Sequence, residues 1–301
     1  MKTVVASPTS GWLRAMPWLF VLIWSTGFIV ARYGMPYAPP LKFLSVRYLL
    51  TIACFAAWVI AAGVAWPKSR AQWGHLMVTG VLMQAGYLGG VWSAVHAGMG
   101  AALVSLLVGV QPVLTAIWLA SRGGAVSRRQ WLGLLLGFAG LVLVVWRKLE
   151  LSGEVNSTTM SFAIAALLSI TAGTLYQKRF VAPCDVRTAN LLQQVAALLV
   201  TLPFALLETA VIDWNPTSAA AMAWAVLALS LGGSSLLYML IQHGTATTVS
   251  SLLYLVPPCT AVMAWVLFRE PIGALTIAGI GLTAVGVMLV VREPRPAAIR
   301  V

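Results

Sequence analysis

Residues 101–147 read AALVSLLVGVQPVLTAIWLASRGGAVSRRQWLGLLLGFAGLVLVVWR, and residues 247–292 read TTVSSLLYLVPPCTAVMAWVLFREPIGALTIAGIGLTAVGVMLVVR. Each stretch has a run of small or hydroxyl residues, a proline inside an apolar segment, a short charged turn and a glycine-striped apolar segment. A shift of 146 residues without gaps superimposes them. The residues that coincide are Gly27 with Gly173, Gly86 with Gly232, Gly98 with Gly244, Ser105 with Ser251, Pro112 with Pro258, Gly133 with Gly279 and Gly140 with Gly286. The chain therefore contains an internal repeat.

The composition is that of a membrane protein. The chain has 301 residues, of which 60% are hydrophobic and 9% charged, and its mean hydropathy is +0.91. Soluble domains carry about 25% charged residues. The net charge of +12 does not indicate a nucleic-acid partner, because the basic residues sit in short connectors between apolar runs, where they orient a membrane protein. We expect a lipid bilayer and a small-molecule solute as partners, and no nucleic acid.

The apolar runs predict ten transmembrane helices, since a span needs about 20 mostly apolar residues. The short connectors leave no room for a soluble domain, so residues 1–301 form one integral membrane domain. Repeat one covers about 10–150 and repeat two about 156–292, separated by the polar stretch LELSGEVNSTT. The predicted spans are approximately 16–34, 41–65, 75–96, 100–120, 130–147, 159–177, 188–208, 218–242, 246–268 and 273–291.

The distribution of charge predicts the orientation. With the amino terminus inside, the tails and the even-numbered connectors hold 13 of the 19 basic residues, and five of the seven acids lie on the other side. This excess of Lys and Arg predicts a bacterial-type inner membrane protein with both termini in the cytoplasm. Each repeat has an odd number of spans, so the second copy enters the membrane from the opposite side. The predicted fold class is thus an all-α membrane protein of two inverted-topology five-helix repeats.

The two repeated stretches, together with the start WSTGFIVARYG…PP…FLSVRY, resemble the ten-span EamA-type branch of the drug/metabolite transporter superfamily. The resemblance implies a secondary transporter, not an enzyme, that exports small metabolites such as amino acids by alternating access. It also implies a central cavity lined by spans 1, 3, 4, 6, 8 and 9. One departure is the turn Arg122–Ala125, which lacks the acidic residue often found there. The second copy has Glu270 at that place.

No Asp or Glu lies deep in a predicted span. Carriers of cations usually need an intramembrane carboxylate, so a neutral, zwitterionic or anionic solute is expected. The alternatives are a channel, a flippase for a lipid-linked intermediate and an intramembrane enzyme, although no catalytic dyad is visible in the sequence.

Cys54, Cys184 and Cys259 form no CxxC pair, so neither a metal site nor a cofactor is expected. The oligomeric state is left open, a monomer included.

Arg47 is the strongest single candidate for a solute-binding residue. It lies some seven residues inside the second span, where an arginine costs up to about 3 kcal/mol to insert. It could dock a carboxylate, or it could be a structural residue that snorkels to the interface. Its position nearer the interface than the midplane favours the structural interpretation, and its repeat mate is Gln193.

Other candidate binding residues are polar or aromatic side chains within the spans, which should turn away from lipid. The prolines Pro112 and Pro258 are expected to kink spans four and nine beside the pathway. The glycines Gly133, Gly137, Gly140, Gly279 and Gly286 are interpreted as packing faces with no role in binding. The remaining candidates are Trp24, Gln84, Tyr87, Ser105, Gln111, Thr174, Ser234, Tyr238 and Tyr254.

Overall fold

A computed structural model describes residues 9–123, 127–151, 153–243, 252–253, 255–269 and 273–291, and these residues form helices and connectors without a strand. Two of the segments, marked η, have π-helical hydrogen bonding. In chain order the elements are α1 (Thr9–Gly34), α2 (Pro40–Ala61), α3 (Arg70–Gly80), η1 (Val81–Gly86), α4 (Tyr87–His96), α5 (Ala101–Val108), α6 (Gln111–Ser121), α7 (Arg128–Leu151), α8 (Ser157–Phe180), α9 (Val186–Leu207), α10 (Pro216–Trp224), η2 (Ala225–Gly233), α11 (Ser234–His243), α13 (Val256–Phe268) and α14 (Ala274–Val291).

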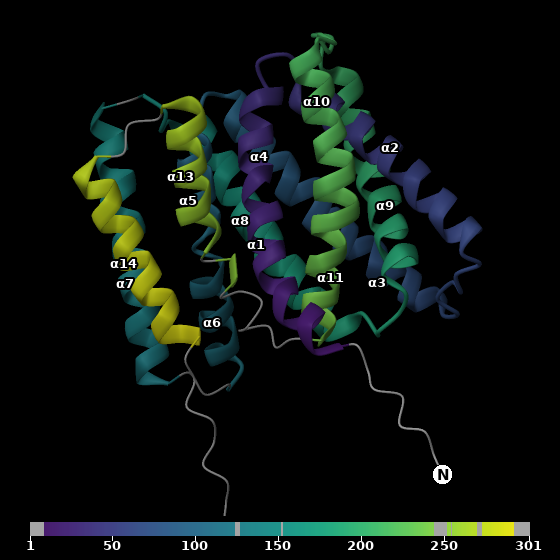
Figure 1. Cartoon of the computed structure of the whole chain (residues 1–301), viewed down its shortest axis with the longest axis horizontal. Coiled ribbons are helices and arrows are strands. Elements are labelled where there is room, and N and C mark those ends of the chain that lie inside the picture. Colours follow the sequence, from purple (N-terminus) through teal and green to yellow (C-terminus); the bar gives the residue numbers. More distant parts are fainter. Residues whose placement is uncertain are drawn as a thin grey trace, which may run out of the picture.

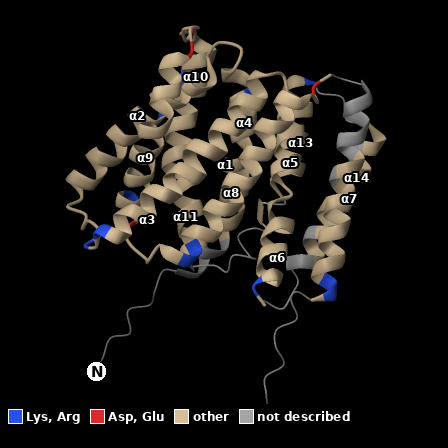
Figure 2. Ribbon diagram, turned by 180° about the vertical axis from the view of Figure 1, so that it is seen from behind, with Lys and Arg blue, Asp and Glu red and all other residues tan. Residues whose placement is uncertain are grey.

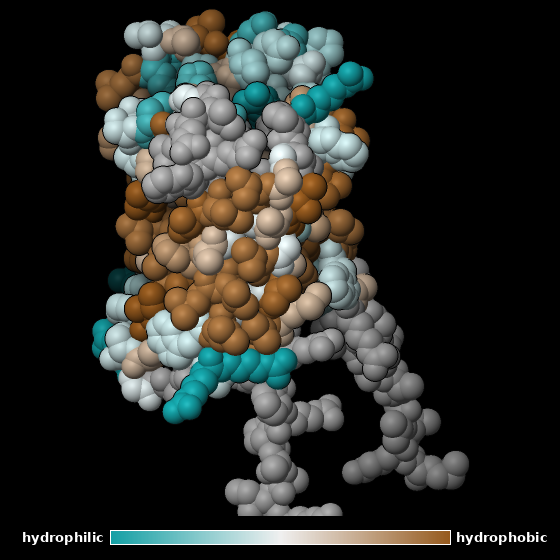
Figure 3. Space-filling model, turned by 90° about the vertical axis from the view of Figure 1, so that its left-hand side faces the viewer, coloured by the Kyte–Doolittle hydropathy of each residue, from teal (hydrophilic) through white to brown (hydrophobic). Residues whose placement is uncertain are grey.

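Six helical stretches among the described residues are long and apolar enough to cross a membrane, and Val256–Phe268 and Ile277–Gly286 are shorter apolar helices. Figure 3 shows hydrophobic side chains across the middle of the α7–α14 side and hydrophilic ones at both ends. A surface of this kind matches the apolar interior of a bilayer. The six stretches are Ala15–Gly34, Pro40–Ala61, Ala101–Ser121, Ser157–Phe180, Val186–Leu207 and Pro216–Gln242.

The helices stand side by side in one bundle (Figure 1). The pair α7 and α14 forms one edge and the pair α2 and α9 forms the other, with α1, α4 and α8 between them. The main core is built from large side chains in this central part. Phe43 of α2, for example, stacks on Trp92 of α4 with ring centroids 4.8 Å apart, and both rings are almost completely buried.

Charged residues gather at the two ends of the bundle (Figure 2). We call the end where α1 begins the lower end and the end where α10 begins the upper end, as in Figure 1. Among the helix ends and connectors whose side chains the structure describes, the lower end has eight basic residues and one acid, and the upper end has three basic residues and three acids. The lower set is Lys68, Arg70, Arg122, Arg128, Arg129, Lys178, Arg179, Arg187 and Asp185, and the upper set is Arg32, Lys42, Arg269, Glu154, Glu208 and Asp213.

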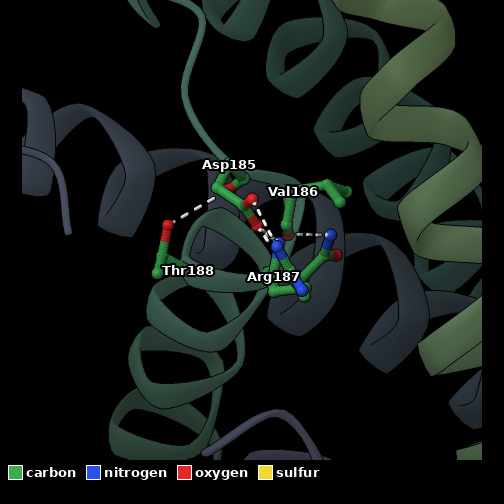
Figure 4. A network of polar contacts seen from close by, with 5 residues as sticks. Asp185, Val186, Arg187 and Thr188 are labelled. Atoms are coloured by element: carbon green, nitrogen blue, oxygen red, sulfur yellow. Dashed lines mark hydrogen bonds and ion pairs between the residues drawn. The ribbon is translucent and has the colours of Figure 1, made fainter. Parts of the chain in front are cut away.

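A carboxylate binds the first turn of each helix of the α2–α9 pair. At the upper end, Glu208 accepts hydrogen bonds from the backbone N–H groups of Leu41 and Lys42, at 3.0 and 2.8 Å, which otherwise have no partner in the first turn of α2. At the lower end, Asp185 caps α9 by accepting from the N–H of Arg187, and its carboxylate also binds the Arg187 guanidinium at 2.9 Å (Figure 4). The Arg187 hydrogen bond lowers the pKa of the Asp185 carboxyl.

Proline breaks a helix at the centre of the bundle. Helix α5 ends at Val108, and α6 restarts at Gln111 with Pro112 in its first turn. A proline is tolerated in a first turn because the N–H that it lacks would have no partner there. The expected kink at Pro112 is therefore a break between two helices. Gly109 in this break lies against Pro257 at the start of α13, where a Cβ on the glycine would come within 2.7 Å of the ring.

Candidate functional site

A cavity opens between α1, α2, the η1–α4 junction and the η2–α11 junction. The space between its side chains is about 380 Å³, including its open mouth. The cavity is narrow, because the centre of a water-sized sphere can move in only about 30 Å³ of this space. Its lining residues are Trp24, Gly27, Phe28, Arg47, Gln84, Tyr87, Leu88, Val91, Trp92, Leu229 and Ser234.

Arg47 provides the charge in this lining. Its side chain is only 2% exposed, and its Nε donates a hydrogen bond to Ser230 Oγ at 3.0 Å. Its guanidinium carbon lies 5.8 Å from the centroid of the Trp92 ring, within reach of a cation–π interaction. The guanidinium nitrogen Nη1 is buried and has no hydrogen-bond partner. An unpaired charged donor of this kind is costly unless a ligand completes it.

Aromatic rings form one wall of the cavity. The rings of Trp24 on α1 and Tyr87 on α4 lie 3° from parallel with centroids 6.0 Å apart. Phe20 also contacts Trp24, with ring centroids 5.1 Å apart, and this contact helps to hold the indole in place. Rings such as these offer broad apolar faces to an aliphatic or aromatic solute.

The two π-helical segments meet the cavity on its polar side. In η1, the backbone carbonyl of Gln84 accepts a hydrogen bond from the Tyr48 hydroxyl at 2.8 Å, and the Gln84 amide donates to Ser234 Oγ at 3.4 Å. Ser234 follows η2 and donates in turn to the carbonyl of Leu229 within it. Short π-helical segments occur frequently at functional sites. Here they bring an amide and a hydroxyl group from two helices together.

The structure brings together five of the predicted binding residues, namely Trp24, Arg47, Gln84, Tyr87 and Ser234. Arg47 faces the cavity rather than snorkelling to an end of the bundle. The residues that line this cavity come from the predicted spans one, two, three and eight, and none of them comes from spans four, six or nine.

The other predicted residues lie elsewhere. Gln111 donates to Thr174 Oγ1 at 3.1 Å and so links α6 to α8. Ser105 is buried and bonds the carbonyl of Ala102 in its own helix. Tyr238 contacts Cys184 near the lower end, with 3.0 Å between its hydroxyl and Sγ. Pro258 lies in the first turns of α13, and Tyr254 falls outside the described residues.

Sequence reasoning missed several lining residues, among them Trp92 and Phe28. A signal for Trp92 was present, because Gln84, Leu88, Val91 and Trp92 follow one another at helical spacing on a single face. Ser230 had no signal as an arginine partner, since the contact joins residues 183 positions apart.

Hydrogen bonds join several helices and connectors at the lower end of the bundle. Gln72 of α3 makes two hydrogen bonds with the backbone of Ala182, between α8 and α9. Lys178 of α8 donates to the carbonyl of Ile241 at the end of α11 at 2.9 Å. These contacts join α3 to the α8–α9 connector and α8 to α11 at the lower end.

The groups around the cavity are of the kinds that recognise a negative charge beside an apolar group. Arg47 supplies a positive charge, Gln84 and Ser234 supply polar groups, and Trp24 and Tyr87 supply apolar surface. Among the described residues there is no cluster of His, Cys, Asp or Glu that could hold a metal ion.

Comparisons with known proteins identify the family. The model of the EamA-like transporter family matches residues 15–146 and 157–292. The chain belongs to the EamA-like transporter family. It is a multi-pass membrane transporter, and the family and its relatives indicate transport, not catalysis. Each of the two matched segments corresponds to one copy of the repeat seen in the sequence.

Relatives of this EamA-family chain carry similar descriptions. It is 27% identical over 288 residues to an uncharacterized transporter of Archaeoglobus fulgidus, covering 88% of this chain and 94% of the relative. It is 23% identical to a probable amino-acid metabolite efflux pump of Salmonella typhimurium (90% and 92% covered). It is 22% identical to the uncharacterized inner membrane transporter YedA of Escherichia coli (89% and 87% covered). A solved crystal structure shares the fold, with a TM-score of 0.71 and 17% identity over 91% of this chain and 94% of that one.

Proposed function

We propose that this transporter carries small solutes with a carboxylate, such as amino acids, out of the cytoplasm by alternating access. The observation that carries the proposal is Arg47, a buried guanidinium that lines the cavity and leaves Nη1 without a partner. Charge-assisted hydrogen bonds from arginine to carboxylates are about twice as strong as neutral ones. A bound carboxylate would complete the donors of Arg47.

The rest of the lining supports an amino-acid-like solute. The apolar faces of Trp24 and Tyr87 suit a solute side chain, and Gln84 with Ser234 offers polar groups to a backbone amine or a hydroxyl. The lining contains no Asp or Glu, which argues against a carrier of simple cations. The description of the Salmonella typhimurium relative as a probable amino-acid metabolite efflux pump supports both the solute class and the direction.

The helix bounds support ten spans arranged as two inverted repeats. A shift of 146 residues carries α2 (Pro40–Ala61) onto the bounds of α9 (Val186–Leu207) and places η1 within η2. Gly140 of α7 lies against Gly279 of α14, and Gly286 lies against Gly133, which is the same contact with the repeats exchanged. Helices α7 and α14 therefore run antiparallel, as expected for repeat mates of opposite topology.

The charge pattern supports a cytoplasmic lower end. Cytoplasmic connectors carry an excess of Lys and Arg, and the lower end holds eight of the basic residues counted above. Both chain termini would then lie in the cytoplasm. Hydrogen bonds of Gln72 and Lys178 join helices at the lower end, and alternating access that opens this end would require those contacts to break.

A ligand screen followed by transport in liposomes tests the proposal. The purified protein is heated in detergent with each L-amino acid and, in parallel, with the matching amino-acid amide, which lacks the carboxylate. Ligands that bind the folded state raise the unfolding temperature. We expect stabilisation by one or more amino acids and little by the matching amides.

Hits are then tested for saturable uptake into liposomes preloaded with the same unlabelled solute. Uptake that saturates and is stimulated by the internal solute indicates a carrier. Equal stabilisation by acids and amides would contradict carboxylate recognition, and uptake linear in concentration would indicate a channel.

A further inference from the structure

A second hollow lies on the outside of the bundle, between α6 and α8. Its space is about 970 Å³ including its open side, so it is larger than the central cavity. Leu168, Trp118 and Phe180 in its lining are 55%, 48% and 45% exposed, so the groove faces the surroundings and not the core. Its lining residues are Leu114, Trp118, Leu168, Thr171, Ala172, Leu175, Tyr176, Arg179 and Phe180.

The groove is apolar along most of its length and basic at its lower end. Arg179 lines that end, and the guanidinium of Arg122 lies 4.7 Å from the centroid of the Trp118 ring beside it. No acidic side chain lines the groove. This charge pattern suits a molecule with an apolar body and an anionic head.

The length of the groove matches one leaflet of a bilayer. From Leu168 to Arg179, α8 rises about 17 Å at about 1.5 Å per residue. Half of the hydrocarbon core of a bilayer is about 15 Å thick. An acyl chain with its phosphate at Arg179 would therefore reach the middle of the membrane near Leu168.

The wall of the groove is held in place from the protein side. His75 of α3 lies 2.9 Å from the Tyr176 hydroxyl and stacks on Phe180 with ring centroids 5.5 Å apart. Tyr176 and Phe180 are also in ring contact with each other, at 4.7 Å. Fixing these side chains in advance lowers the entropy lost when a ligand binds.

We propose that the α6–α8 groove binds one anionic phospholipid of the leaflet at the lower end, with its phosphate between Arg179 and Arg122 and an acyl chain along α8. The occupant is a lipid because the groove opens onto the apolar surface of a membrane protein. The anionic class follows from the two arginines at the level of the headgroups. The proposal does not depend on the solute of the central cavity.

Native mass spectrometry of the whole purified chain in a nonionic detergent tests the headgroup. Phosphatidylglycerol and phosphatidylcholine with identical acyl chains are titrated separately, and lipid adducts are counted. A basic residue near a membrane surface contributes about 1 kcal/mol toward anionic lipid, so Arg179→Gln and Arg122→Gln should each weaken phosphatidylglycerol binding about five-fold.

Arg70→Gln is the matched control. Arg70 is an exposed arginine at the same end of the bundle, at the start of α3 and outside the groove. It should leave phosphatidylglycerol binding unchanged. Equal affinity of the wild-type chain for both lipids, or an equal loss in the Arg70→Gln variant, would overturn the proposal.

A second pair of variants tests the acyl chain. Ala172→Trp fills the groove and should reduce the adducts of both lipids, whereas Leu199→Trp, on the exposed face of α9, should not. If Ala172→Trp binds phosphatidylglycerol like the wild-type chain, the lipid does not occupy this groove.

Discussion

Replacing Gly140 by alanine should loosen the contact between α7 and α14. A Cβ at this position would lie 2.5 Å from the carbonyl oxygen of Gly279 and 2.8 Å from Thr283 Oγ1, closer than atoms pack. The helices must separate, and overpacking of this kind costs about 1–3 kcal/mol. Gly286→Ala should have a similar effect, because its Cβ would overlap the carbonyl of Gly133.

Gly281→Ala provides a control on the same helix pair. A Cβ on Gly281 meets no atom within 4 Å, so the change brings only the gain in helix propensity, which is about 1 kcal/mol at most. The assay is equilibrium unfolding in mixed detergent micelles with increasing sodium dodecyl sulfate. We expect Gly140→Ala and Gly286→Ala to unfold at lower, and similar, denaturant fractions than Gly281→Ala. If all three variants are equally stable, the close approach of α7 and α14 is refuted.

Three further predictions follow from single contacts. Asp185→Asn keeps the cap of α9 but removes the negative charge. Because Arg187 lowers the pKa of Asp185 in the folded state, the wild-type chain should be more stable than the variant above about pH 4, and this difference in stability should vanish as the pH falls through the lowered pKa. Unfolding at several pH values measures the difference, and a difference that does not change with pH would contradict the prediction. Glu208→Ala removes the carboxylate that accepts hydrogen bonds from two N–H groups at the start of α2. The free energy of unfolding should fall by about 1–3 kcal/mol in the same detergent assay. A change near zero would show that water replaces the carboxylate as the acceptor. Ser230→Ala removes the hydrogen-bond acceptor of Arg47 Nε. In thermal-shift titrations it should weaken solute binding about five-fold without changing the preference for carboxylates. An unchanged affinity would show that Ser230 does not position the arginine.

Much of the helix layout could be predicted because a bilayer imposes strict requirements. Backbone groups in lipid must bond within their own helix, so apolar runs of about 20 residues become helices. The predicted spans 188–208 and 218–242 accordingly agree closely with Val186–Leu207 and Pro216–Gln242. The spacing of Lys and Arg also predicted that charge would divide between the two ends of the bundle.

Contacts between distant residues could not be predicted in this way. Hydropathy placed Glu208 at a span end but gave no sign that its carboxylate caps α2, because that contact joins residues 167 positions apart. The π-helical segments have no compositional signature, so the junctions that bring Gln84 and Ser234 together were not foreseen. Pro112 predicted irregularity in the fourth span, but a single proline does not distinguish a kink from the observed break.

Arg47 illustrates how far local reasoning reaches. Its distance from the end of span two favoured an arginine that snorkels to the interface, whereas the structure buries it against Ser230 and Trp92 in the cavity. The rotation of α2 about its axis decides between these outcomes. That rotation is set by packing against α9 and α4, and the sequence of one helix does not contain it.

The most direct test is the preference of the protein for an acid over its amide, measured by thermal-shift titration in the wild-type chain and in two Arg47 variants. The two ligands are the amino acid identified by the screen and its amide. A charged hydrogen bond contributes about 1.5–3 kcal/mol, so the wild-type protein should bind the acid about 10- to 150-fold more tightly than the amide. Arg47→Lys should retain part of this preference, and Arg47→Gln should lose it. An undiminished preference for the acid in folded Arg47→Gln protein would contradict the assignment of Arg47 as the carboxylate-binding residue.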